Sequence, residues 1–155
     1  MKKFTIILVA FAMLSTVFVS CKKDEETVKA AGSASASLTV GSAAAVTWTA
    51  TAATAVKSGT SYTITATGTN STNLVIKVDN VTAAGTYTLT TAPRTASFTT
   101  GGKTYSTTNN GGGNVIITSL TGDKIEGTFL AEMFDGTTST AVYCSLGSGK
   151  FSASF

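Results

Sequence analysis

The chain has 155 residues, of which 12% are charged and 43% hydrophobic, so it suits one modest domain with an appendage and is not disordered throughout. Its net charge of +3 includes Lys2 and Lys3 of an N-terminal leader, which leaves no basic stripe for nucleic acid. Histidine, the commonest general base and metal ligand, is absent, so we expect a protein that is not an enzyme and holds no cofactor or metal.

Residues 1–20 have the three parts of a secretory signal peptide. Lys2 and Lys3 precede the apolar run "FTIILVAFAMLSTVFV", and the small residue Ser20 follows it. The run falls short of the roughly 17 to 25 residues that a membrane-spanning helix needs. We therefore expect a cleaved signal peptide and not a transmembrane anchor.

Cys21 stands at the border between this leader and a charged run. The sequence "FVSC" resembles the lipobox of bacterial lipoproteins, although Phe18 replaces the usual leucine and Val19 the usual small residue. In that family the cysteine takes a diacylglyceryl thioether and becomes the new N-terminus after cleavage. The resemblance implies that Cys21 is lipidated, with palmitate among its acyl chains, and that the protein is held at a membrane by this lipid.

The five residues after Cys21 carry the only dense cluster of charge in the chain: Lys22, Lys23, Asp24, Glu25 and Glu26. Lysine followed by acidic residues resembles the export signal of Bacteroidota-type lipoproteins, which directs them to the outer face of the outer membrane. The alternative is a solvated cluster that keeps the tether off the bilayer. The export reading predicts a cell-surface location.

Residues 27–45 read "TVKAAGSASASLTVGSAAA" and consist mainly of Ala, Ser and Gly. Gly32, Gly41 and the serines disfavour a stable helix, so this composition predicts a flexible tether. The expected organisation is a signal peptide over 1–20, lipidated Cys21 and tether over 21–45, and a folded domain over 46–155.

From residue 46 onward, short Thr-rich runs alternate with period two between glycine-rich turns. About ten such runs without helical periodicity predict an all-β antiparallel domain. We expect a β-sandwich of about 8 to 10 short strands, with a closed up-and-down β-barrel as the alternative, because alternation alone does not separate them. The runs cover residues 46–51, 61–67, 73–78, 85–90, 95–100, 103–108, 114–120, 125–133, 140–146 and 150–155.

The same alternation predicts which side chains face the core. Gly127 falls in this inward phase, where its missing side chain would admit a neighbour such as Trp48 or form a bulge. The expected inward set is Trp48, Tyr62, Ile64, Leu74, Ile76, Val78, Tyr87, Leu89, Phe98, Tyr105, Ile125, Phe129, Ala131, Val142, Cys144, Leu146, Phe151 and Phe155.

The domain also resembles a known family. Ile125, Gly127, Thr128 and Phe129 form an Ile-x-Gly-Thr-Phe motif, and a later strand opens with Gly-x-Phe at Gly149. Together with "AVTWTA" and "AAGTYTLT", these segments are similar to a family of uncharacterised, lipid-anchored Bacteroidota proteins known only as a domain of unknown function. The resemblance implies an envelope β-domain and supplies no site residues.

Few residues suggest site chemistry. Glu126 and Glu132 share one strand face about 20 Å apart, too far for a glycosidase pair. Asp123 and Asp135 fall in turns, although Asp135 with turn carbonyls could bind calcium. Cys144 lacks a partner and a base, so we expect a buried inert thiol.

Two further residues could bind a ligand, although each also has a simpler structural explanation. Trp48 could stack on a sugar, but a lone Trp in an alternating strand is more often core. Arg94, the only arginine, follows the only proline, so this loop could hold a carboxylate or carry solvated charge.

The sequence therefore favours a surface-displayed envelope lipoprotein that acts as a non-catalytic binding module for an unknown glycan, peptide or small ligand. The alternative is a structural or adhesin-like envelope protein without a small ligand. An exposed Trp48 would favour the binding role, and a buried Trp48 the structural role.

Overall fold

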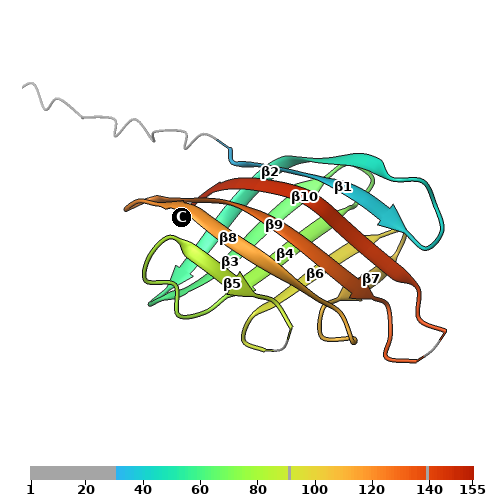
Figure 1. Cartoon of the computed structure of the whole chain (residues 1–155). Coiled ribbons are helices and arrows are strands. Elements are labelled where there is room, and N and C mark those ends of the chain that lie inside the picture. Colours follow the sequence, from blue (N-terminus) through green and yellow to red (C-terminus); the bar gives the residue numbers. More distant parts are fainter. Residues whose placement is uncertain (1–30, 91, 139) are drawn as a thin grey trace, which may run out of the picture.

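The computed structural model describes residues 31–90, 92–138 and 140–155. The described residues form strands and turns, and no helix among them is long and apolar enough to cross a membrane. The strands are β1 (Ser33–Val40), β2 (Val46–Ser58), β3 (Ser61–Gly68), β4 (Asn73–Val78), β5 (Gly85–Thr88), β6 (Thr95–Thr100), β7 (Lys103–Ser106), β8 (Gly112–Leu120), β9 (Lys124–Phe134) and β10 (Tyr143–Ser154) (Figure 1).

Eight strands close into a ring. Around the ring the order is β1, β2, β3, β4, β6, β7, β9 and β10, and β10 returns to β1. Neighbours in the ring run antiparallel. One additional parallel pair, Ser154 with Thr54, links β10 to β2 across the end of β1. The all-β antiparallel prediction is confirmed. The closed barrel, which was the alternative, is observed in place of the expected sandwich, because β10 pairs with β1 and so closes the sheet on itself.

β5 and β8 leave this ring and pair with each other. β8 lies along β9 from Gly112 to Leu120, and β5 lies on the outer edge of β8. β7 reaches β9 only at Ser106 and Phe134, beyond the end of the β8 pairing. One side of β9 is thus shared between β8 and β7, which extends the barrel wall into a four-stranded surface of β5, β8, β9 and β10.

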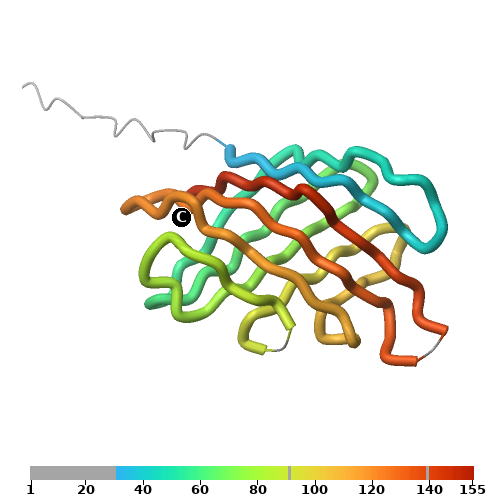
Figure 2. Tube along the Cα trace, in the orientation of Figure 1, coloured from blue at the N-terminus to red at the C-terminus, as the bar shows by residue number. Residues whose placement is uncertain are grey.

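The prediction of a tether over 27–45 is wrong for β1. Residues 33–40 pair with β10 on one side and with β2 on the other, so β1 is an integral strand of the ring. Figure 2 shows this segment in blue running beside the red final strand. Ala34, Ala36 and Leu38 are buried because these alternate positions of β1 face the barrel interior. The remainder of the predicted tether up to residue 30 lies outside the described residues.

The inward faces of the strands fill the barrel with side chains. The fully buried ones include Phe98, Ile64, Leu74, Ile76 and Leu146. The Trp48 ring meets the Phe98 ring edge-on, with centroids 5.3 Å apart. Interdigitated side chains of this kind form a close-packed interior. A ligand would therefore have to bind at the outside of the barrel or at its ends.

Most of the predicted inward residues are buried as expected. Tyr87, Val142 and Phe155 are partly buried and pack against the core. The prediction omitted Leu38, Val81, Val115, Ile117 and Met133, and of the buried alanines it included only Ala131. In "NVIITSL" three consecutive apolar residues hide the alternation, and alanine is too small to mark a face by hydropathy.

Gly127 is enclosed as predicted, but the neighbour that it admits is not Trp48. A Cβ at Gly127 would lie 2.9 Å from Cζ of Phe151, and a bulge in β8 falls opposite it, after Ile117. Trp48 instead lies over Gly68, where an added Cβ would be 2.7 Å from its Nε1. The error arose because the pairing of β9 with β10 was not known from sequence.

Candidate functional site

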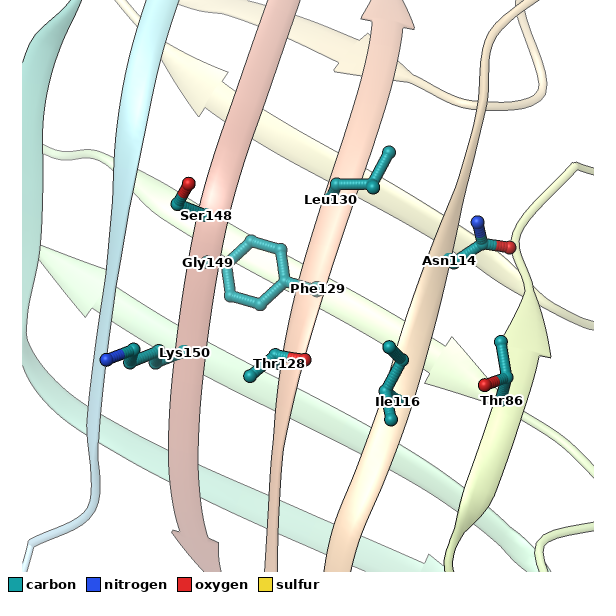
Figure 3. A pocket seen from close by; sticks show the side chains of 9 residues that line it. All are labelled: Thr86, Asn114, Ile116, Thr128, Phe129, Leu130, Ser148, Gly149 and Lys150. Carbon is teal, nitrogen blue, oxygen red and sulfur yellow. The ribbon is translucent and has the colours of Figure 1, made fainter.

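A hollow of about 380 Å³ lies on the outer face of the four-stranded surface (Figure 3). The register places Thr86, Ile116, Thr128 and Lys150 in one row across β5, β8, β9 and β10. A second row passes through Asn114 and Leu130 towards the β10 bulge. Outward side chains from four strands thus meet at one place. We call this hollow the outer groove.

The floor of the outer groove is aliphatic. Ile116 is 44% exposed and Leu130 is 48% exposed, and they occupy diagonal positions on adjacent strands. Single exposed aliphatic residues are common on protein surfaces, but two that meet in a hollow form a surface that an apolar group can cover. The surrounding outward positions are mainly Thr and Ser, so the apolar floor is local.

A bulge in β10 shapes one wall of the groove. Pairing with β9 is interrupted between Leu146 and Gly149, and Ser148 in this interval has a left-handed φ of 49°. The ring of Phe129 lies against Gly149, where a Cβ would be 2.5 Å from Cζ of the ring (Figure 3). The groove therefore reaches an aromatic ring of the barrel wall where β10 carries no side chain.

The rim of the outer groove is polar. The side chains of Thr86, Asn114, Thr128, Ser148 and Lys150 have no hydrogen-bond partner among residues 31–90, 92–138 and 140–155. Hydroxyl and amide groups of this kind can donate to or accept from a ligand. The groove thus combines an aliphatic floor with several polar groups that are free to orient a bound molecule.

Lys150 borders a second hollow as well. This hollow, of about 300 Å³, continues from Lys150 across Ser35 of β1 to Thr49 of β2. The ion pairs of the described chain are Lys103 with Asp135 and Lys124 with Glu126, so Lys150 belongs to neither. Figure 3 shows its side chain directed away from Ile116 and Leu130, towards β1, so its ammonium group lies at the margin between the two hollows.

Of the site residues predicted from the sequence, some lie outside the described residues and Trp48 lies in the core. Cys21 and the charged residues 22–26 lie outside the described part of the chain. Trp48 is a core residue, 6% exposed, and its Nε1 donates to Thr72 Oγ1 over 2.9 Å. The sugar-stacking hypothesis for Trp48 therefore lacks an accessible ring.

The carboxylate of Asp135 is held by its own neighbours. Asp135 Oδ1 accepts the backbone N–H of Val142 at 2.7 Å, and Oδ2 accepts Lys103 Nζ at 2.9 Å. A calcium ion at Asp135 would have to displace Lys103. Within the described residues, no group of three or more Cys, Asp or Glu side chains is placed to hold a metal ion.

Cys144 is buried, as the sequence predicted. Burial raises the pKa of its thiol to about 11, because the charged thiolate is poorly solvated inside the barrel. The thiol is therefore protonated at neutral pH, and Cys144 is unsuited to nucleophilic chemistry.

Comparison with protein families identifies the family to which this chain belongs. A family described as a domain of unknown function, DUF6252, matches residues 36–152. The chain belongs to this family. The match begins inside β1 and ends inside β10, so the DUF6252 domain includes most of a strand that its composition had suggested to be a tether.

No curated protein matches the chain, and no solved structure matches it either. The residues of the outer groove were not identified from the sequence. One signal was present: Leu130 is an apolar residue in the outward phase of β9, between inward Phe129 and Ala131. Such a residue marks an exposed apolar position once the phase of the strand is known.

Proposed function

We propose that this DUF6252 protein is a lipid-anchored envelope protein, displayed on the outer surface of the outer membrane, that acts as a non-catalytic binding module. The signal-like leader, the "FVSC" sequence and the charged residues 22–26 support the anchor and the location. The outer groove supports the binding role.

The observation that carries the binding proposal is the chemistry of the outer groove. Ile116 and Leu130 offer an aliphatic floor, and Lys150 offers an unpaired positive charge at one end. The complementary ligand is a small amphipathic molecule with an aliphatic body and an acidic head. Its size fits a hollow of about 380 Å³, which lies within the usual range of small-molecule sites.

Calorimetric titration of the soluble domain with octanoate tests this proposal. Octanoate should bind saturably, and octanol should bind more weakly because it lacks the charge for Lys150. Leu130→Ser should weaken octanoate binding about tenfold or more, since covering a leucine is worth about 1.5–3 kcal/mol.

Val56→Ser is the matched control for Leu130→Ser. Val56 is 67% exposed on β2 and does not line the groove, so its loss should leave octanoate binding unchanged. Lys150→Gln should reduce the preference for octanoate over octanol. Equal effects of Val56→Ser and Leu130→Ser would contradict a site at the groove.

A second candidate function is a structural or adhesin-like role without a small ligand. The buried position of Trp48 favours it, because no tryptophan is exposed for stacking on a sugar. The Thr-rich outward faces would then serve as the contact surface. Failure of all amphipathic probes to bind, with adhesion lost on deletion of the gene, would favour this candidate.

The anchor and its orientation are tested in cells. Wild type should incorporate labelled palmitate and be cut by protease added to intact cells, whereas Cys21→Ala should lose the label. The Lys22→Ala, Lys23→Ala, Asp24→Ala variant should keep the label and become protected. Protection of the labelled wild type would contradict surface display and indicate a periplasmic protein.

A further inference from the structure

Arg94, the only arginine of the chain, is held in a defined orientation beside β5. Its Nε donates to the backbone carbonyl of Asp79 over 3.1 Å, and its guanidinium carbon lies 5.3 Å from the centre of the Tyr87 ring. Tyr87 is itself fixed, because its hydroxyl donates to the carbonyl of Ala83 over 2.8 Å. One edge and one face of the guanidinium are thus already engaged.

The rest of the guanidinium is unused. Arg94 belongs to neither ion pair of the described residues, and its bond to Asp79 is its only hydrogen bond within them. The carboxylate of Asp79 is engaged elsewhere, since it accepts the hydroxyl of Ser61. The four N–H bonds of the two Nη atoms therefore have no acceptor in the described structure, although a guanidinium has the geometry to bind a planar oxyanion through two parallel hydrogen bonds.

Arg94 borders a hollow of about 290 Å³ beside β5. Asn80, Thr88 and Thr90 line the same hollow with Ala92 and Pro93, and none of these three polar side chains has a hydrogen-bond partner among the described residues. An amide and two hydroxyls are thus free beside an oriented cation. This arrangement is what a small polar anion requires.

We propose that this hollow is a binding site for a carboxylate group, with Arg94 as its main partner and Asn80, Thr88 and Thr90 as secondary ones. A single guanidinium balances the single charge of a carboxylate, whereas a phosphate dianion would need a second cation. The site shares no lining residue with the outer groove, although Thr88 pairs with Asn114 of the groove's rim. It does not depend on the proposed function of that groove.

Titration of the ¹⁵N-labelled domain with sodium acetate tests the site by NMR, with sodium chloride at equal ionic strength as the reference. Acetate should shift the Arg94 Nε–H signal and the amides of Asn80 and Thr88 saturably, and chloride should not. A linear response, or an equal response to chloride, would overturn the proposal.

Variants identify the residue responsible. Arg94→Gln should abolish the saturable shifts at Asn80 and Thr88, and Arg94→Lys should weaken acetate binding at least tenfold because the planar fork is lost. Thr88→Val keeps Arg94 and should also weaken binding; Thr88 is exposed, so the fold should be retained. Leu130→Ser in the outer groove should have no effect. Unchanged acetate binding by Arg94→Gln would overturn the assignment.

Two further probes define the ligand. Tighter binding of inorganic phosphate than of acetate would overturn the carboxylate assignment. An N-acetylated dipeptide acid presents the same carboxylate as acetate: tighter binding than acetate assigns the site to a peptide terminus, and equal binding assigns it to a small acid. Both results support the site, whereas equal binding of the corresponding dipeptide amide would contradict it.

Discussion

Gly149 and Phe129 form a close contact in the barrel wall. A Cβ at Gly149 would lie 2.5 Å from Cζ of Phe129 and 2.6 Å from Cε1 and Cε2. The ring has little room to move, because Phe129 is buried and its centroid lies 6.4 Å from that of Phe151. At Gly147, two residues earlier, a Cβ would meet nothing within 4 Å. The two glycines of one strand therefore have different roles.

We predict that Gly149→Ala destabilises the domain by about 1–3 kcal/mol through overpacking, whereas Gly147→Ala is close to neutral. Urea unfolding followed by Trp48 fluorescence measures both, and Trp48 is the only tryptophan. Combining Gly149→Ala with Phe129→Leu should cost less than the sum of the two single changes, because the smaller side chain relieves the overlap. Equal costs for the two glycine variants would contradict this contact.

At the scale of the strand, β1 is the element whose membership of the fold is easiest to test. Ala36 is 4% exposed and faces the core, whereas the neighbouring Ser37 faces outward. Both residues pair with β2, at Trp48 and Thr47 respectively. The two positions are adjacent in sequence and opposite in environment.

Ala36→Asp should therefore prevent folding or destabilise the domain severely, because it buries an unpaired charge. Ser37→Asp should have little effect, since the carboxylate remains in water. Circular dichroism and urea unfolding of the two variants check this expectation. If both variants are as stable as wild type, the segment behaves as a tether and β1 is not part of the barrel.

An ion pair ties the start of β7 to the connection between β9 and β10. The hydrogen bond from Lys103, followed by that from the Val142 N–H, lowers the pKa of Asp135 below its usual 3.8, and the same pair raises the pKa of Lys103 above 10.5. The contribution of Asp135 to stability is fully present at pH values above its usual pKa of 3.8. It is lost as the pH falls through the lower pKa of the folded state. The contribution of Lys103 to stability is fully present at pH values below its usual pKa of 10.5. It is lost as the pH rises through the higher pKa of the folded state.

Asp135→Asn should thus lower the urea midpoint modestly at about pH 7, and the difference from wild type should shrink towards about pH 2, where the wild-type carboxyl is protonated as well. Asp123→Asn is the control, because Asp123 lies in a turn and belongs to no ion pair of the described chain. Salt should also reduce the difference at neutral pH, since Lys103 is exposed. A difference that does not depend on pH would show that the ion pair is not its source.

For the whole molecule, closure of the ring joins the first and last strands of the barrel. β10 pairs with β1, from Ser33 with Ser152 to Val40 with Cys144, and with β9 on its other side. Long segments of chain must be ordered before the contacts between β1 and β10 can form, and this entropy slows folding.

We accordingly predict refolding in about milliseconds to seconds, as for other domains dominated by non-local strand pairing. Stopped-flow dilution from urea, with Trp48 fluorescence as the signal, measures the rate. Recovery of the full native signal within microseconds would contradict the non-local closure.

Local pattern accounted for much of this fold. The period-two runs predicted the positions of β3 to β9 and the first half of β2, because each strand alternates between a buried and a solvated face, whatever its partners are. The predicted run 46–51 stops short of the observed end of β2 at Ser58. The last two predicted runs, 140–146 and 150–155, form the single strand β10, because a glycine-rich bulge at 147–149 continues the strand where a turn was expected. β1 was missed because its alanines and serines differ too little in hydropathy to show their alternation.

The sequence by itself thus determined an all-β antiparallel domain, most of its core and the burial of Cys144. The predictions of anchoring and location rest on the leader and the charged residues after it. Only the tertiary structure decided that the sheet closes into a ring, that β1 belongs to it, and that Ile116, Leu130 and Lys150 meet in one groove. The physical reason is that alternation is a property of each strand alone. Register and closure depend on which distant strands bury each other's edges, and a binding surface built from several strands exists only after that pairing is made.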